Sequence, residues 1–152
     1  RSIVLSSSDE KLVRARDLGA EFTVNYLAQP DWGPLVFEMA GHGVDAVVEI
    51  GGSGTMENSL AAIRHGGHIN IIGYMAGAQL DTTVFPLIIR NANLHGIGTG
   101  NRDSYEAMMR FVESSALRPV IERSYRFDQA AQALAELAAG GHFGKLVLDY
   151  AL

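Results

Sequence analysis

The sequence predicts an α/β fold built around a doubly wound parallel sheet. Short apolar runs alternate with longer amphipathic segments along the chain, which is the pattern of repeated strand–helix–strand units. Three of the short runs have glycine at or directly after their last residue, where the turns that follow the strands of such sheets lie. No repeat, charge block or low-complexity linker interrupts this alternation.

Strands are expected where apolar and β-branched residues gather in short runs. These runs cover residues 2–5, 22–25, 45–50, 68–72, 93–98 and 145–149. The segment 117–127 has alternating apolar positions around Pro119, and it is interpreted as an extra edge strand or a connection.

The first helix is predicted directly after the first strand. Ser7 and Glu10 form a capping-box pattern, and Gly19 is the expected stop. Between them lies an apolar face made of Leu12, Val13, Ala15 and Leu18.

The other helices are expected between glycine, asparagine or aspartate residues. They cover residues 31–40, 53–64, 103–115 and 128–139. Gly33 and Pro34 weaken the first turn of the earliest of these helices. Pro86 interrupts the segment 78–91, which is therefore expected to form a loop and a short helix.

Composition argues against several classes of function. The 152 residues have a net charge of −5 with scattered Lys and Arg, so no nucleic-acid partner is expected. The chain has no cysteine, which excludes disulfides and thiolate zinc sites within it and fits a cytoplasmic location. The apolar runs are far shorter than the roughly 20 residues that span a bilayer, and no signal peptide is visible, so no membrane partner is expected. Arg1 in place of an initiator methionine suggests a fragment.

The first strand ends in hydroxyls rather than in a carboxylate. At the end of the second strand of a dinucleotide-binding fold, an acidic side chain holds the adenosine ribose. Ser6, Ser7 and Lys11 could instead donate to a 2′-phosphate, which a carboxylate would repel. In this interpretation the run at 2–5 is the second strand of the fold, and the first strand with its glycine loop is absent from the given sequence.

Three further strand ends contain glycine, namely Ile50-Gly51-Gly52, Ile72-Gly73-Tyr74 and Ile97-Gly98-Thr99. A missing Cβ lets a flat ring or a pyrophosphate approach the backbone at such a place. Each glycine would also suit an ordinary tight turn. Together with the serines at the end of the first strand, these three strand ends indicate one shared cofactor groove.

A competing interpretation rests on Glu49, because an acidic residue before a glycine-rich turn is also how methyltransferases bind S-adenosylmethionine. Ser53 interrupts the expected alternation of glycines, and no acidic residue follows the strand that ends at Ile72. A methyltransferase-like domain therefore stays as the alternative.

Other catalytic patterns are absent from the sequence. It contains neither a Gly-x-Ser-x-Gly elbow nor a Walker loop. His65 and His68 flank a glycine pair with no carboxylate or cysteine spaced to complete a metal site, and His42, His95 and His142 are isolated along the chain. No metal is expected to bind these histidines.

A set of phrases occurs in one order along almost the whole chain. They are Ser8-Asp9-Glu10-Lys11-Leu12 with Ala15 and Leu18-Gly19-Ala20, Val24-Asn25-Tyr26, Gly43-Val44-Asp45-Ala46-Val47-Val48-Glu49, Gly66-Gly67-His68-Ile69, Ile72-Gly73 and His142-Phe143-Gly144-Lys145-Leu146-Val147. This ordered set resembles the cofactor-binding domain of the medium-chain dehydrogenase/reductase superfamily, in its zinc-type alcohol dehydrogenase and quinone-reductase-like branches.

The resemblance implies NADP(H) as the cofactor. Ser6 lies where NAD-preferring relatives carry an acidic residue, Lys11 matches the basic residue near the adenosine ribose, and Tyr26 matches a tyrosine that approaches the 2′-phosphate. The glycine-bearing strand ends would line the dinucleotide groove and meet the nicotinamide. Gly144 and Lys145 would lie near the closing end of the cleft.

The resemblance also implies an oxidoreductase that transfers hydride between the nicotinamide and a small carbonyl, alcohol or quinone/enone substrate. The family's pyrophosphate loop and catalytic domain do not occur in this sequence, so no catalytic residue is assigned and the fragment alone is expected to be inactive. Zinc, if used, would be bound by the missing domain. A non-catalytic NADPH-binding member is a further alternative. Relatives commonly dimerise through their last strands, which makes the segment from Asn93 to Gly98 the candidate edge of a homodimer.

Residues 1–152 are thus expected to be a partial dinucleotide-binding domain followed by a C-terminal segment. In the doubly wound strand order 3-2-1-4-5-6 the first strand lies in the middle of the sheet. The strands at 2–5 and 45–50 should then face each other across an unpaired gap. Each open buried backbone group costs about 1–3 kcal/mol, so the chain on its own should be poorly stable.

Overall fold

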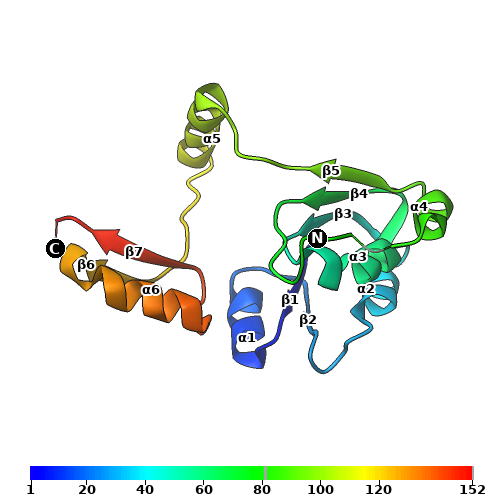
Figure 1. Cartoon of the computed structure of the whole chain (residues 1–152), viewed down its shortest axis with the longest axis horizontal. Coiled ribbons are helices and arrows are strands. Elements are labelled where there is room, and N and C mark those ends of the chain that lie inside the picture. The colour runs from blue at the N-terminus through cyan, green and yellow to red at the C-terminus, as the bar shows by residue number, and fades with distance from the viewer. Residues whose placement is uncertain (81, 152) are drawn as a thin grey trace. The chain divides into compact units, whose positions relative to one another are not determined.

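The strands and helices form in the order that the alternating pattern predicts. The computed structural model describes residues 1–80 and 82–151 and divides into two compact units, Arg1–Thr99 and Gly100–Leu152 (Figure 1). The first unit contains β1 (Ile3–Ser6), α1 (Asp9–Asp17), β2 (Phe22–Asn25), α2 (Trp32–Ala40), β3 (Val44–Glu49), a 3-10 turn (Gly52–Gly54), α3 (Met56–Ala62), β4 (Ile63–Ile71), α4 (Val84–Arg90) and β5 (Asn93–Gly96). The second contains α5 (Arg102–Ser114), β6 (Ile121–Arg126), a 3-10 turn (Phe127–Gln129), α6 (Ala130–Ala139) and β7 (Lys145–Asp149).

The strands of the first unit form two parallel blocks. β1 pairs with β2, while β3, β4 and β5 form a three-stranded sheet in that order. Among the described residues β1 does not pair with β3, so the predicted gap between these strands is confirmed. Because the pairing is parallel, the carboxyl ends of the strands lie at one edge of each block.

β4 begins earlier than predicted. The helix expected at 53–64 is instead a 3-10 turn followed by the shorter α3, so the helix prediction is wrong for Ile63 and Arg64. Ile63 has extended dihedral angles (φ −72°, ψ 147°), is fully buried and pairs with Val44. A β-branched residue suits such a buried, extended position better than the end of a helix.

α1 begins with a different serine from the one predicted. Ser8, not Ser7, is the N-cap, and its Oγ accepts a hydrogen bond from the backbone N–H of Lys11 (3.3 Å). The Oγ of Ser6 accepts a hydrogen bond from the N–H of Ser8 (3.2 Å). The turn at residues 6–8, here called the serine turn, is therefore fixed by its own side chains. The stop at Gly19 is confirmed, since this residue follows the helix with φ 103°.

Two apolar clusters form the core of the first unit. Their buried residues are Val24, Trp32, Val36 and Ala62 in one, and Met56, Leu60, Ile63 and Ile69 in the other. α2 and α3 lie so close together that a Cβ on Gly33 would be 2.4 Å from the carbonyl oxygen of Asn58. The Asn58 side chain also accepts a hydrogen bond from the Gly33 N–H (2.8 Å). This close contact explains a glycine in the first turn of α2.

In the second unit the two strands pair with each other. The segment 117–127 contains β6, which pairs with β7 in parallel. Tyr125 of β6 is buried, and its hydroxyl donates to the Glu136 carboxylate of α6, which also binds the Arg123 guanidinium (2.8 Å). The bond to Glu136, aided by burial, raises the pKa of Tyr125 above its usual value.

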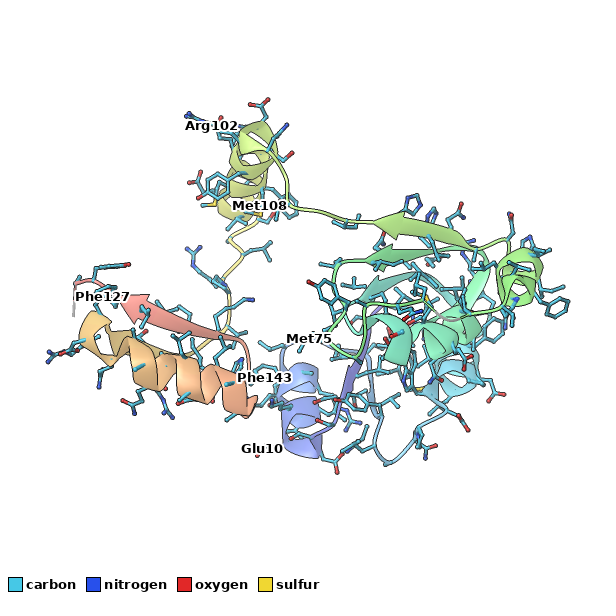
Figure 2. All side chains as sticks on the ribbon, viewed as in Figure 1. Glu10, Met75, Arg102, Met108, Phe127 and Phe143 are labelled. Atoms are coloured by element: carbon cyan, nitrogen blue, oxygen red, sulfur yellow. The ribbon has the colours of Figure 1, made fainter. Side chains whose placement is uncertain are left out.

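None of the side chains of α5 is buried within its own unit. Met108 on this helix, for example, is 52% exposed (Figure 2). Its Asn101 N-cap accepts from the Ser104 N–H (2.9 Å), which defines where the helix begins. Across residues 1–80 and 82–151, the helices are all too short or too polar to cross a membrane.

Candidate functional site

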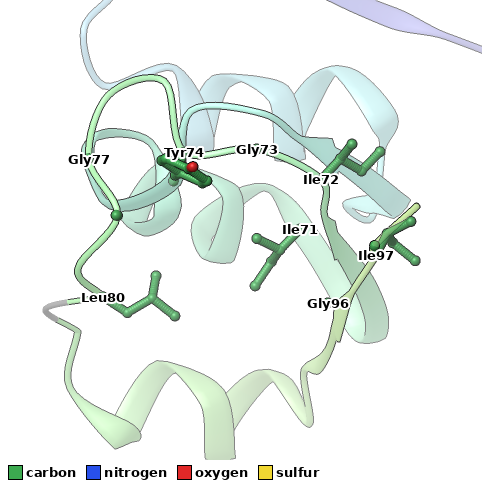
Figure 3. A pocket seen from close by; sticks show the side chains of 11 residues that line it. Ile71, Ile72, Gly73, Tyr74, Gly77, Leu80, Gly96 and Ile97 are labelled. Carbon is green, nitrogen blue, oxygen red and sulfur yellow. The ribbon is translucent and has the colours of Figure 1, made fainter.

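A pocket of about 390 Å³ lies at the carboxyl ends of β4 and β5 (Figure 3). Predicted cofactor residues that line it are Gly52, Ile72, Gly73, Tyr74, Ile97 and Gly98. The wall is made of glycine backbone and large apolar side chains, which suits the face of a flat ring. Ile50, Gly51 and Thr99, also predicted, are not among the described residues that line it.

The other residues that line the pocket were not predicted from the sequence. They are Ile71 and Gly96 on the strands and Gly77, Ala78 and Leu80 on the loop after β4. Figure 3 shows Leu80 across the hollow from Ile97. The sequence of the segment 78–91 predicts a loop, but it does not indicate that this loop lines a pocket.

The loops after β3 and β4 hold each other in place beside the pocket. The N–H of Ala76 donates to the carbonyl oxygen of Gly51 (2.7 Å), and the N–H of Ser53 donates to that of Gly77 (3.0 Å). These backbone bonds fix the shape of the pocket rim independently of the side chains.

Two of the predicted glycines, Gly52 and Gly73, lie where the backbones of neighbouring strand ends and loops pack closely. Gly52 has φ 81°, and a Cβ on it would be 2.2 Å from the carbonyl oxygen of Gly77. A Cβ on Gly73 would lie 2.8 Å from the oxygen of Ile50. At Gly98, by contrast, a Cβ would meet no described atom within 4 Å. Close backbone packing therefore explains Gly52 and Gly73, while the end of β5 is open.

Glu49, at the end of β3, is the internal anchor of the turn that follows. It is only 3% exposed, and its carboxylate accepts hydrogen bonds from the N–H groups of Gly51 (2.7 Å) and Gly52 (3.1 Å). It also accepts from the hydroxyls of Thr55 (2.5 Å) and Ser59. A buried carboxylate needs such partners. Glu49 is thus committed to the protein itself and is not available to a ribose.

The predicted phosphate side lies at the carboxyl ends of β1 and β2. The backbone N–H of Tyr26 donates to the carbonyl oxygen of Ser6 (3.1 Å), which brings this tyrosine beside the serine turn. Ser7 and Tyr26 are exposed, whereas Ser6 and Lys11 are half-buried. The four predicted residues therefore share one small β1–α1–β2 surface that is rich in hydrogen-bond donors.

Asn25, which the sequence analysis did not select, organises this surface. Its side-chain N–H donates to the Asp9 carboxylate (2.7 Å), and its Oδ1 accepts from the N–H groups of Leu27 (3.0 Å) and Ala28 (3.4 Å). The turn that carries Tyr26 is thereby fixed to the start of α1. An asparagine at the end of a strand is a known turn signal and could have indicated this role.

Gly144 and Lys145 belong to the second unit. Gly144 has φ 91°, and a Cβ on it would be 2.4 Å from the carbonyl oxygen of Val120. The N–H of Lys145 donates to the same oxygen (2.8 Å), and its side chain is exposed. This close contact at the start of β7 explains why residue 144 is a glycine. A role of Gly144 and Lys145 at the cofactor cleft stays a prediction.

One prediction about the histidines is wrong. His95 is not isolated, because its Nε2 lies 3.2 Å from the Nδ1 of His68 on the neighbouring strand. His65 instead has its Nδ1 3.3 Å from the carbonyl oxygen of Ile89. In the described part of the chain, no group of three or more His, Cys, Asp or Glu could hold a metal ion.

Comparison with known proteins points to one family. Residues 1–114 match the family model of zinc-binding dehydrogenases. The chain is 35% identical over 150 residues to a zinc-type alcohol dehydrogenase-like protein of Schizosaccharomyces pombe, covering 95% of this chain and 43% of that protein.

Solved structures show the same fold. A crystal structure from Sinorhizobium meliloti 1021 described as an alcohol dehydrogenase matches with a TM-score of 0.89 and 38% identity, over 97% of this chain and 43% of that one. An NAD-dependent alcohol dehydrogenase matches at 0.84 and 33%, over 98% and 43%. A 2-octenoyl-CoA carboxylase reductase in complex with NADP and 2-octenoyl-CoA matches at 0.86 and 25%, over 96% and 37%. The chain thus spans less than half the length of each of these proteins.

Proposed function

We propose that this chain, which belongs to the zinc-binding dehydrogenase family, is the cofactor-binding part of an NADP(H)-dependent oxidoreductase. The observation that supports this most is the apolar pocket at the carboxyl ends of β4 and β5. Ligands of open parallel α/β sheets bind at these strand ends. The methyltransferase interpretation is wrong, because the family is a dehydrogenase family and Glu49 is bonded internally.

In this proposal the nicotinamide ring occupies the pocket. Ile72 and Ile97 would contact its faces, and the open backbone at Gly98 would let its carboxamide approach. When bound, the cofactor supplies a hydride to, or accepts one from, a small carbonyl, alcohol or quinone/enone substrate. The apolar wall would keep water from the reacting face.

The 2′-phosphate would bind at the β1–β2 end. Ser6, Ser7 and Tyr26 offer hydroxyl donors, and Lys11 offers a positive charge. The nearby Asp9 carboxylate is already bonded to Asn25. The solved neighbours include both an NAD-dependent enzyme and an NADP complex, so the choice between the cofactors rests on these four residues.

Zinc, which the family name implies, does not fit the residues of this chain as a catalytic centre. The sequence has no cysteine, and the described histidines and carboxylates form no group of three ligands. No step of the proposal uses a metal, and no residue of this chain is assigned as a proton donor.

The proposal includes a cytoplasmic homodimer that forms through the segment from Asn93 to Gly98. β5 is the last strand of its sheet, with one edge not paired to any described strand. The preceding helix α4 also exposes apolar side chains, with Phe85 at 67% and Ile88 at 70%. An open strand edge beside such a surface suits a second copy of the same chain. A monomer of the intact protein at micromolar concentration would count against this part.

The proposal is tested by titrating the intact protein with NADPH, NADH and S-adenosylmethionine, and then assaying quinone, enone, aldehyde and alcohol turnover. We expect NADPH to bind more tightly than NADH and at least one substrate class to be turned over. Binding of S-adenosylmethionine in place of NADPH would overturn the proposal. NADPH binding without turnover of any class would identify a non-catalytic member instead.

A further inference from the structure

Asn25 lies beside the serine turn, at the carboxyl end of β2. In the parallel register it is the partner of Ser6, so the two residues are one strand spacing of about 4.8 Å apart. The backbone N–H of the next residue, Tyr26, donates to the carbonyl oxygen of Ser6 (3.1 Å). A change at residue 25 therefore occurs next to the surface on which the 2′-phosphate is expected to bind.

The side-chain amide of Asn25 uses both of its ends. Its Oδ1 accepts from the N–H groups of Leu27 (3.0 Å) and Ala28 (3.4 Å), which closes the turn that carries Tyr26. Its N–H donates to the carboxylate of Asp9 in the first turn of α1 (2.7 Å). An aspartate at this position could accept from the two backbone groups but could not donate to Asp9. Among side chains of this size, only an amide makes both contacts at neutral pH.

The charge of Asp9 favours the helix and disfavours a phosphate. A carboxylate in the first turn of a helix is stabilised by the helix dipole. The same charge would repel a 2′-phosphate at the neighbouring serine turn. Because Asp9 is exposed, the bond from Asn25 helps to fix its carboxylate at the start of α1. The amide thus holds one negative charge in place and adds none of its own.

We propose that Asn25 is a positioning residue that makes the β1–β2 end selective for a 2′-phosphate over a free ribose hydroxyl. Its neutral amide keeps negative charge away from the strand end opposite Ser6, holds Asp9 at the start of α1 and places Tyr26 beside the serine turn. Asn25 does this through its neighbours and not through contact with the cofactor. This role rests on the proposed binding of NADP(H) by the intact protein.

The test uses two small probes that differ only in the 2′-phosphate, adenosine 2′,5′-bisphosphate and adenosine 5′-monophosphate. Neither probe contains a nicotinamide, so their binding does not depend on the apolar pocket. Each is titrated calorimetrically into the intact wild-type protein, Asn25→Asp, Asp9→Asn and the double variant Asp9→Asn/Asn25→Asp. The double variant has the net charge of wild type, and its new amide at position 9 can donate to its new carboxylate at position 25. The hydrogen bond is therefore kept, while the charge moves to the strand end.

Asn101→Asp is the matched control for the added charge. It makes the same chemical change at the exposed N-cap of α5, outside the β1–α1–β2 surface. Aspartate is as good an N-cap as asparagine, so the helix should be unaffected. We expect this control to bind both probes as wild type does.

We expect Asn25→Asp to bind the bisphosphate at least about fivefold more weakly, because the new carboxylate repels the 2′-phosphate, and to bind the monophosphate almost as wild type does. Asp9→Asn should bind the bisphosphate at least as tightly as wild type. The double variant should unfold in urea like wild type and yet show the loss of bisphosphate binding. If Asn25→Asp does not fold, the double variant gives the answer by itself.

A double variant that binds the bisphosphate as tightly as wild type would overturn the role of Asn25, because the hydrogen bond alone would then be sufficient. Equal losses of both probes in Asn25→Asp would overturn it as well. A wild-type protein that binds the two probes equally would give a different result. It would refute the proposed preference for NADP(H), and the role of Asn25 with it.

Discussion

Replacing Glu49 with glutamine should destabilise the protein rather than remove a ligand contact. The Glu49 carboxylate accepts two backbone N–H bonds at 2.7 and 3.1 Å and two hydroxyl bonds, all in a site that is 3% exposed. Hydrogen bonds to a charged acceptor contribute roughly 1.5–3 kcal/mol and neutral ones roughly 0.5–1.5 kcal/mol. Three of the four bonds share Oε1, which the amide oxygen of Glu49→Gln can replace at the lower value. Each of these three bonds should weaken by about 1–1.5 kcal/mol, so we expect the free energy of unfolding to fall by about 3–4.5 kcal/mol.

The assay is urea unfolding of the intact protein, followed by circular dichroism, together with the KM for NADPH. Glu57→Gln is the matched control, because Glu57 is an exposed residue of the neighbouring α3 and should change stability by no more than about 0.5 kcal/mol. If Glu49→Gln unfolds like wild type while the KM for the cofactor rises, then Glu49 binds ligand and does not anchor the turn.

Three further changes test other parts of the structure. Ser6→Asp should weaken NADPH binding about tenfold and leave NADH binding almost unchanged. The reason is that the new carboxylate and the 2′-phosphate, two like charges at about 4 Å, repel by about 1 kcal/mol or more. Equal losses for both cofactors, measured by fluorescence titration, would argue against the phosphate role. Gly52→Ala should lower the free energy of unfolding, measured in urea, by at least about 2 kcal/mol. Alanine disfavours φ 81°, and its Cβ would be 2.2 Å from the carbonyl oxygen of Gly77. Unchanged stability would mean that the two loops are not packed in this way. The pKa of Tyr125 is raised by its bond to Glu136, so its contribution to stability is present below pH 10.0 and is lost as the pH rises through the raised value. The stability of wild type should then fall more steeply above pH 10.0 than that of Tyr125→Phe in pH-dependent unfolding, and parallel curves would contradict this.

The fold was largely predictable because strand and helix patterns are local. The apolar runs at Phe22–Asn25 and Lys145–Asp149 form strands with the predicted bounds. The errors occur where a tertiary contact overrides the local pattern. Ile63 continues the helical periodicity of the residues before it, but pairing with Val44 in the core makes it a strand residue. The sequence analysis named no partner for β7, because its pairing with β6 depends on contacts that no local pattern indicates.

The candidate site was predictable only in part. Glycines after strands indicated the edge of the sheet, and six predicted residues line the pocket. The sequence does not reveal that Gly52 and Gly73 are needed for packing between loops, because this depends on where the loop after β4 folds back. The anchoring role of Glu49 and the contact between His68 and His95 were missed for the same reason, since their partners lie on other elements.

We propose that the two strand-end regions of the first unit bind one NADP(H) molecule. A crystal structure of the intact protein with NADP⁺ tests it most directly. We expect the nicotinamide ring in the pocket beside Gly73 and Ile97, and the 2′-phosphate within hydrogen-bonding distance of Ser6 and Tyr26. A nicotinamide bound away from this pocket, or a 2′-phosphate that touches neither residue, would contradict it.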